Sequence, residues 1–183
     1  MPDPTGQVSN DREVYSPVRS IAAHRQQAVK VWSTILAIAG FWLLAIVAAP
    51  ISRSSDLTTL ANPLYKFFGY ICHQISARSF FVFGEQLGVC SRCFGVYLGI
   101  LVGVAVYPLW RGVDSIEPLP RFWLFLSLIP ISIDWSLTVF GIWENTQWSR
   151  LITGSILGFV CATFIVPAIV EITRNFFPIR SHS

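Results

Sequence analysis

Charged residues and histidines are scarce in this sequence. Lys and Arg total 13, Asp and Glu total 10, and there are three His among 183 residues. The net charge of +3 is small, and the sequence has no basic run, RNA-binding signature or zinc-finger spacing of Cys and His. These features argue against nucleic acid as a partner.

Motifs for several cofactors are also missing. Only His73 lies in the body of the chain, which excludes a haem held by two histidines of one chain, and there is no HExxH. Phe94 follows Cys93, so the CxxCH of covalent haem attachment is absent. No glycine-rich phosphate loop is present either. Any chemistry must therefore come from other residues.

Apolar residues are abundant, at 53% of the chain. Four segments reach the length of about 20 residues that crosses a bilayer, and they are 31–51, 91–110, 122–141 and 151–172. The sequence thus predicts an all-α membrane protein with four transmembrane helices, partnered by the lipid bilayer. We expect a polar cytoplasmic tail at 1–30, a transmembrane domain at 31–174 and a cytoplasmic C-terminal tail at 175–183.

The orientation follows from the distribution of Lys and Arg. The two tails and the second loop lie on one side of the four spans and hold eight of these residues, whereas the first and third loops hold five. The positive-inside rule therefore predicts cytoplasmic N- and C-termini and an extracytoplasmic first loop, in a plasma or inner membrane.

The first loop, residues 52–90, is too long for a plain connector and is expected to be partly structured. Residues 57–70 have apolar positions at helical spacing, which predicts a short interfacial helix. Residues 79–82 and 87–89 flank Gly84 and predict a hairpin. Such a hairpin would bring Cys72 and His73 close to Cys90.

The cysteines of this loop carry the strongest chemical signal. Cys90 and Cys93 lie at i and i+3 in the first turn of a helix, where the helix dipole and Arg92 favour the thiolate. With Cys72 and His73 they form the pattern C-H-x16-C-x2-C, which predicts a Cys3His site for zinc or another transition metal.

Other interpretations of these cysteines stay open. Adjacent side chains on regular backbone point in different directions, so Cys72 and His73 can both ligate a metal only from irregular backbone. A three-ligand site with one open position, which is the catalytic type, is an equal alternative. A redox-active Cys90–Cys93 pair, a structural disulfide and simple apolar packing are the remaining ones.

Small residues repeat every four positions in two of the spans. Gly95, Gly99 and Gly103 form one such ridge, and Gly154, Gly158 and Ala162 form the other. Ridges of this kind allow two helix backbones to approach closely. Packing one against the other would place Arg150 beside the CxxC motif. The alternative is a homodimer formed through either ridge.

Asp134 is the only charged residue in the third apolar segment. A carboxylate at this depth is costly and usually faces a partner or a cavity. We expect Arg92 or Arg150 as its partner, and Asp134, Arg92 and Arg150 as candidate catalytic residues. Arg78, Arg92 and Arg150 are candidate ligands for an anion. A structural ion pair is the plainer interpretation of Asp134.

Four motifs together resemble a known family. Cys72-His73-Gln74, Arg78-Ser79-Phe80, the CxRCxGxYxG run from Cys90 to Gly99, and Arg150-x-x-Thr-Gly154 are similar to family 2085 of the domains of unknown function. The resemblance covers residues 71–158 and implies a small bacterial membrane protein with no established activity. Trp135 departs from the pattern at a position where Gly is expected.

A second likeness concerns architecture alone. Four spans with a CxxC at the second helix resemble the quinone-linked disulfide oxidases. Those enzymes pass electrons through a second cysteine pair, which the third loop of this sequence lacks.

The resulting hypothesis is a polar extracytoplasmic pocket lined by Cys72, His73, Cys90, Cys93, Arg78, Arg92, Asp134 and Arg150. It would hold a metal and bind or act on an anionic group such as a lipid phosphate. The alternatives are a membrane thiol-disulfide oxidoreductase that uses Cys90 and Cys93, and a non-enzymatic membrane scaffold.

Overall fold

The computed structural model describes residues 17–115 and 117–176, which form five α-helices and one small hairpin. The helices are α1 (Pro17–Ser54), α2 (Thr58–Gly69), α3 (Ser91–Trp110), α4 (Phe122–Val139) and α5 (Gln147–Phe176). A single 3₁₀ turn, η1 (Ser76–Arg78), precedes strands β1 (Phe81–Val82) and β2 (Glu85–Gln86).

Four of the helices, α1, α3, α4 and α5, are long and apolar enough to cross a membrane. This confirms the predicted fold class. The helix α1 is longer than the expected segment 31–51, because the residues before it include good helix formers such as Ala, Gln and Arg. Within the described residues the expected N-terminal tail therefore continues the first helix. Residues 1–16 and 177–183 of the two expected tails lie outside the described part.

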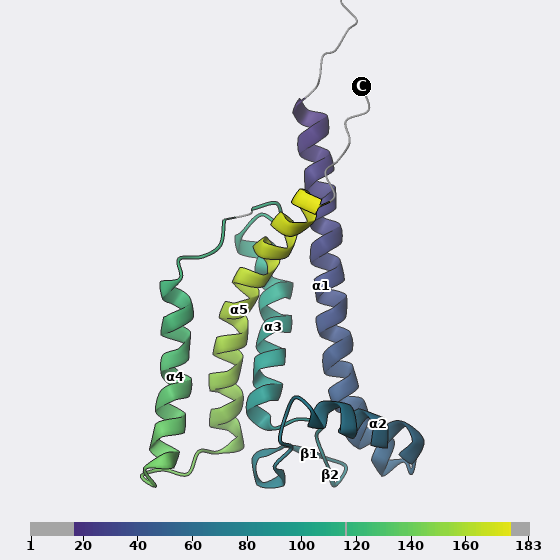
Figure 1. Cartoon of the computed structure of the whole chain (residues 1–183), viewed down its shortest axis with the longest axis vertical. Coiled ribbons are helices and arrows are strands. Elements are labelled where there is room, and N and C mark those ends of the chain that lie inside the picture. Colours follow the sequence, from purple (N-terminus) through teal and green to yellow (C-terminus); the bar gives the residue numbers. More distant parts are fainter. Residues whose placement is uncertain (1–16, 116, 177–183) are drawn as a thin grey trace, which may run out of the picture.

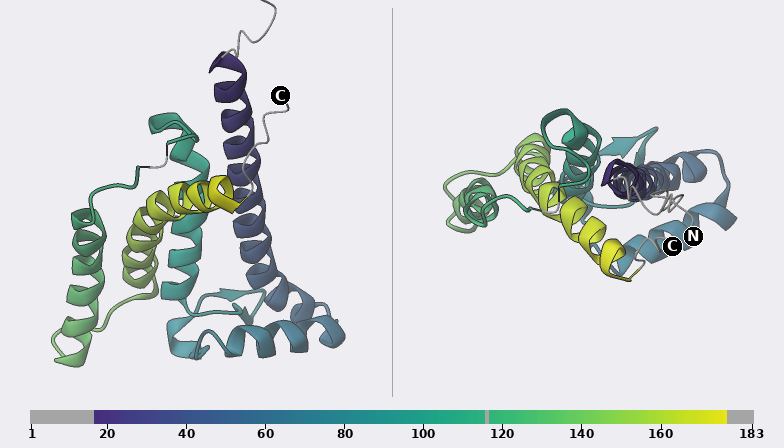
Figure 2. Two further views of the ribbon diagram at one scale, coloured as in Figure 1. Left: turned by 45° about the horizontal axis from the view of Figure 1, so that its top comes forward. Right: turned by 90° about the horizontal axis from the view of Figure 1, so that it is seen from above.

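The long helices stand in a row in the order α4, α5, α3 and α1 (Figures 1 and 2). The closest pair is α3 and α5, which run parallel. A Cβ on Gly99 would overlap the carbonyl oxygen of Ser155, and one on Gly158 would overlap that of Val96. The two glycine ridges therefore face each other within one chain, as predicted for close packing. Because the ridges cover each other, a homodimer would need a different face.

One end of the bundle, here called the cysteine end, is closed by the first loop. The cysteine end consists of α2, the hairpin and the first turns of α3 and α5. The helix α2 lies across the axes of the long helices (Figure 1). A hairpin is present, with Phe81 opposite Gln86 and Val82 opposite Glu85, so its second strand is Glu85–Gln86 rather than the predicted 87–89. Its turn, Phe83–Gly84, has positive φ at both residues, which is the backbone that a two-residue hairpin requires.

The helix α2 is amphipathic, as its sequence predicts. Ala61 and Phe68 are buried against the bundle, whereas Leu60 and Phe67 are largely exposed. Phe68 belongs to an apolar cluster that also contains Leu43, Ile46, Cys72, Leu87 and Val89. This cluster fixes the first loop to α1 and so determines where Cys72 lies.

Candidate functional site

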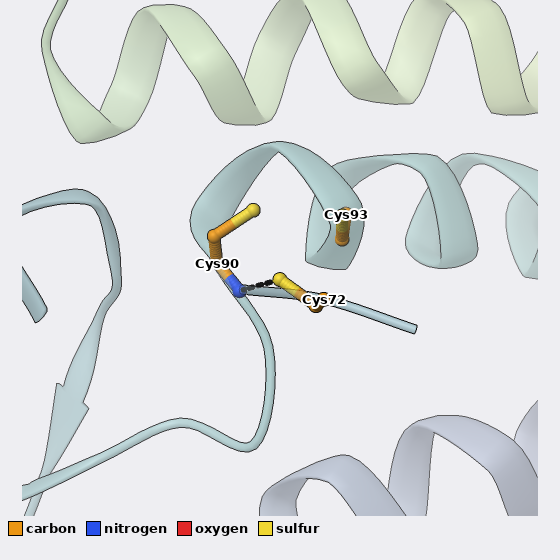
Figure 3. A group of neighbouring side chains, drawn as sticks. All are labelled: Cys72, Cys90 and Cys93. Carbon is orange, nitrogen blue, oxygen red and sulfur yellow. Dashed lines mark hydrogen bonds between the residues drawn. The ribbon is translucent and has the colours of Figure 1, made fainter. Parts of the chain in front are cut away.

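Three cysteines converge at the cysteine end, and they are called the sulfur triad below. Cys90 and Cys93 lie at the start of α3, and Cys72 approaches them from the segment after α2 (Figure 3). The sulfur atoms of Cys72, Cys90 and Cys93 all lie within 4.8 Å of one another. The backbone N–H of Cys90 donates a hydrogen bond to the Cys72 sulfur over 3.2 Å. All four cysteines of the chain are free thiols.

The position of Cys72 depends on local hydrogen bonds. Its backbone N–H donates to the carbonyl of Phe68 at 2.9 Å, so the end of α2 leads directly into it. The side-chain amide of Gln74 then donates to the carbonyl oxygens of Tyr65 and Gly88, at 2.8 Å each. Gln74 thus joins α2, the segment of Cys72 and the segment before Cys90. Its φ of +47° shows that this connection requires irregular backbone.

Hydrogen bonding within the triad favours the thiolate of Cys72. The thiol of Cys90, and after it the thiol of Cys93, holds the pKa of the Cys72 thiol far below its usual range, although burial acts in the opposite direction. Cys72 is 5% exposed. The thiolate is the form of cysteine that metals and disulfide exchange both require.

His73 does not join the sulfur triad. Its side chain is exposed, and its ring nitrogens are not part of the group formed by the three sulfurs. The backbone at these two residues is irregular, and it still does not bring the His73 ring to the sulfurs. The geometry therefore brings together three of the four predicted metal ligands.

A chain of polar contacts lies beside the triad and connects three helices. Arg92 of α3 forms an ion pair with Asp134 of α4. The side-chain amide of Asn145 donates to the same Asp134 carboxylate at 2.9 Å. The carbonyl oxygen of the Asn145 side chain accepts from Arg150 of α5, with a distance of 2.8 Å from Nε. Arg92, Asp134, Asn145 and Arg150 are called the polar chain below.

The remaining predicted anion ligand, Arg78, is also near. Arg78 is exposed at the end of η1, and its carbonyl oxygen accepts from the Ser91 hydroxyl at 2.6 Å. Both Arg78 and Arg92 lie within electrostatic range of Arg150. The structure thus collects all three predicted anion ligands around the start of α5.

The single pocket expected from the sequence is divided by α3. Cys93 packs on the apolar cluster formed with α1 and α2, whereas the neighbouring Arg92 reaches Asp134 of α4. Successive residues of a helix lie about 100° apart, so one helix presents the sulfurs and the guanidinium to different sides. Cys90 lies between the two groups and within electrostatic range of Arg150.

Several residues of the site were not assigned a role from the sequence. Asn145 links Asp134 to Arg150, and Gln74 fastens the loop around Cys72. Trp42 and Tyr97 line the apolar side of the triad, with ring centroids 5.8 Å apart. The sequence offered one signal for Gln74, its place directly after Cys72 and His73. The contacts of Asn145 depend on how the loop folds, so no motif in the sequence indicates them.

The chain was compared with known proteins. A family model described as predicted membrane protein (DUF2085) matches residues 72–164. An uncharacterized protein of Methanocaldococcus jannaschii is 40% identical over 108 residues, which are 59% of this chain and 69% of the relative. An uncharacterized protein of Methanothermobacter thermautotrophicus is 34% identical over 89 residues, which are 48% of this chain and 77% of the relative.

Both of these relatives are archaeal, whereas the resemblance had implied bacterial proteins. No solved structure matches the chain. The family match spans the sulfur triad, α3, α4 and most of α5, and therefore includes every residue of the polar chain. The chain belongs to the DUF2085 family of predicted membrane proteins.

Proposed function

We propose that this membrane protein binds a metal ion through Cys72, Cys90 and Cys93 on the extracytoplasmic side of the membrane. The observation that carries the proposal is the convergence of three sulfurs within 4.8 Å from two separate segments of the chain. Thiolates are soft ligands, so zinc or a similar transition metal fits this site best. The placement outside the cytoplasm rests on the distribution of Lys and Arg.

The spacing of the sulfurs supports a tetrahedral centre. Zinc–sulfur bonds of about 2.3 Å in a tetrahedron place the sulfurs about 3.8 Å apart, so closure needs a shift of about 1 Å at most. The lowered pKa of Cys72 favours the form of the side chain that binds metal. The backbone N–H of Cys90 donates a hydrogen bond to the Cys72 sulfur, and such a hydrogen bond to a ligand atom is typical of metal sites in proteins.

Three protein ligands leave one position of a tetrahedron free. His73 would fill it after a rearrangement of its exposed side chain, and the centre would then be closed and structural. With His73 turned away, an external ligand would occupy that position, and a bound metal would supply a Lewis acid there. Cys90 lies within electrostatic range of Arg150, and this nearby positive charge favours an anionic group as that ligand. Asp134 orients Arg92 in this scheme, because the two form an ion pair.

Metal content tests the proposal directly. Full-length protein purified from metal-supplemented cells is expected to carry about one metal ion per chain by elemental analysis, and Cys90→Ser is expected to lose most of it. The matched control is Cys161→Ser, because Cys161 is a free thiol of α5 outside the triad. Wild-type protein without metal, or Cys90→Ser with wild-type metal content, would contradict the proposal.

The same geometry supports a second candidate, thiol–disulfide exchange with a partner protein. The sulfur of Cys90, which is more accessible than that of Cys72, would pass its proton to the Cys72 thiolate and attack a partner disulfide. This forms a mixed disulfide and releases one partner thiolate. The sulfur of Cys72 would then give that proton to the released thiolate and attack the sulfur of Cys90, which closes a disulfide in this chain and releases the second partner thiolate. Two electrons pass from this chain to the partner. The short distance between the Cys72 and Cys90 sulfurs, with Cys72 favoured as the thiolate, is the observation that supports this candidate.

Alkylation trapping distinguishes the two candidates. Exchange predicts that blocking thiols in intact cells, followed by reduction and a second label, reveals a reducible bond within the triad. Cys72→Ser should abolish it, and Cys161→Ser should not. Thiols that stay reduced under oxidising and reducing conditions would rule out exchange.

A further inference from the structure

Arg150 is a buried cation without a carboxylate partner. It is 8% exposed, and its described hydrogen bonds both end on the neutral side-chain oxygen of Asn145. Within the described residues the ion pairs are Arg53–Glu85 and Arg92–Asp134. The carboxylate that could neutralise Arg150 is thus already paired with Arg92. A charge removed from water in this way is costly unless another group compensates it.

The surroundings of Arg150 increase this cost. Arg78 and Arg92 both lie within electrostatic range and repel it. Three guanidinium groups thus share one carboxylate, and the Cys90 sulfur is a further group that acts on Arg150 with the opposite sign. Arg78 is exposed at the end of η1, so a ligand from solvent can reach its guanidinium.

Two helix termini add to the positive potential. The parallel helices α3 and α5 both begin at the cysteine end, with Ser91 and Gln147 as their first residues (Figure 1). The backbone contact between Gly154 and Arg92 holds these two starts side by side. Each helix start carries a partial positive charge, and two parallel starts reinforce each other.

We propose that Arg150 and Arg78 bind a phosphate-type tetrahedral oxyanion at the start of α5. Arg150 provides a guanidinium whose Nε and one Nη are held by Asn145, which fixes the plane of the fork. Arg78, which is exposed and lies within electrostatic range of Arg150, would supply the second guanidinium. Arg92 is not a direct ligand in this arrangement, because Asp134 holds it, and it acts as a positioning residue.

The chemistry recognised is a phosphate with at least one free edge, because guanidinium groups bind such edges in a bidentate way. Two sources would supply it, the headgroup of an anionic lipid or free inorganic phosphate. This site deepens the proposed function by naming the anion beside the sulfur triad. It uses none of the sulfur atoms, so the two proposals fail separately.

Thermal unfolding of the full-length protein tests the site with two probes. Inorganic phosphate is added to protein in phosphatidylcholine vesicles, and in the second arm the vesicles also contain phosphatidic acid. Ligand that binds the folded state raises the Tm. We expect one probe to raise the wild-type Tm, and Arg150→Gln to weaken its apparent affinity on the order of tenfold or more.

Matched variants keep the test decisive. Arg53→Gln removes an arginine of the last turn of α1 that lies outside the polar chain, and this variant should respond to the probes like wild type. Arg78→Gln changes an exposed side chain and should weaken binding without loss of fold. Arg150→Lys keeps the charge but loses the planar guanidinium, so its apparent affinity should lie between those of wild type and Arg150→Gln. The metal content of these variants should equal that of wild type.

A response to phosphate alone identifies the free anion, and a response to phosphatidic acid alone identifies the lipid headgroup. The proposal is overturned when neither probe raises the wild-type Tm. It is also overturned when Arg78→Gln and Arg150→Lys both keep the full wild-type response, whether or not Arg150→Gln folds.

Discussion

At the scale of single residues, the chemistry of this protein depends on side chains that share protons or charges over short distances. Cys72 accepts from the backbone N–H of Cys90 and from the neighbouring thiols. Asp134 accepts from both Arg92 and Asn145. Each of these groups is stabilised in its ionised form by donors that come from other segments of the chain.

The thiolate of Cys72 leads to a pH prediction for the metal-free protein. Because its pKa in the folded state lies below that of an unfolded chain, the thiolate persists as the pH falls below about 8.5, the ordinary value for a thiol. The associated stabilisation is present above that value and is lost as the pH falls through the folded-state pKa. The ultraviolet absorbance of the thiolate, followed as the pH is lowered, measures the pKa of Cys72. The absorbance that wild type keeps below the ordinary thiol pKa should be missing in Cys72→Ser. A wild-type midpoint at the ordinary thiol pKa would contradict the prediction.

The ion pair between Arg92 and Asp134 gives a stability prediction. The Asp134 side chain is 9% exposed and that of Arg92 is 26% exposed, so Asp134→Asn leaves a partly buried arginine without its counter-charge. The expected loss is about 3 kcal/mol in the free energy of unfolding, measured by chemical denaturation in detergent. Glu85→Gln is the control, because it breaks the Arg53–Glu85 pair, which is much more exposed and is expected to contribute less than about 1 kcal/mol. Equal losses for the two variants would refute the assignment.

At the scale of helices and strands, the pairing of α3 with α5 positions everything at the cysteine end. The two glycine ridges allow the backbones to touch, and the start of α5 is thereby held against the start of α3. Arg150 and Arg92 come from these two starts, so the polar chain depends on the ridge contact.

Paired glycine substitutions test this dependence. Gly158→Ala would push a methyl group into the Val96 carbonyl and the backbone of Ile100, and should destabilise the protein by about 1–3 kcal/mol. Gly40→Ala of α1 meets only the Leu101 side chain, at 4.0 Å, and should be neutral or stabilising by about 0.5–1 kcal/mol. The Tm values of both variants in one detergent provide the measurement. If Gly158→Ala leaves the Tm unchanged, the backbones of α3 and α5 do not touch at Gly158, and the prediction is wrong.

The elements also show how far sequence patterns reach. Apolar length predicted the four long helices, the turn residue Gly84 between two apolar segments predicted a hairpin, and helical spacing predicted α2. The helix α1 begins at residue 17, within the segment expected as a polar tail, because its residues favour helix whether or not they are apolar.

At the scale of the whole molecule, the cysteine end gathers the first loop and the starts of α3 and α5 on one side of the bundle (Figure 2). The distribution of Lys and Arg predicts that this side faces away from the cytoplasm. Both proposed sites would then be reachable from outside the cell membrane.

Labelling of intact cells tests the orientation. A cysteine introduced by Phe83→Cys lies in the exposed hairpin turn and should react with a membrane-impermeant maleimide. One introduced by Glu117→Cys lies in the exposed loop between α3 and α4 and should react only after the membrane is opened. The opposite pattern would reverse the topology and place the sulfur triad in the cytoplasm.

The sequence by itself determined the elements of this protein and the residue types of its site. Apolar run length, the period of small residues and the Cys-His-Gln and CxxC motifs are local properties, and local properties can be read along the chain. The tertiary structure alone decided which of those residues meet. His73 lies apart from the sulfurs, and Cys93 and Arg92 face different sides of α3. Asp134 pairs with Arg92, and Asn145 accepts from Arg150. These pairings depend on helix rotation and loop path, and both are fixed by contacts between segments that lie far apart in the chain.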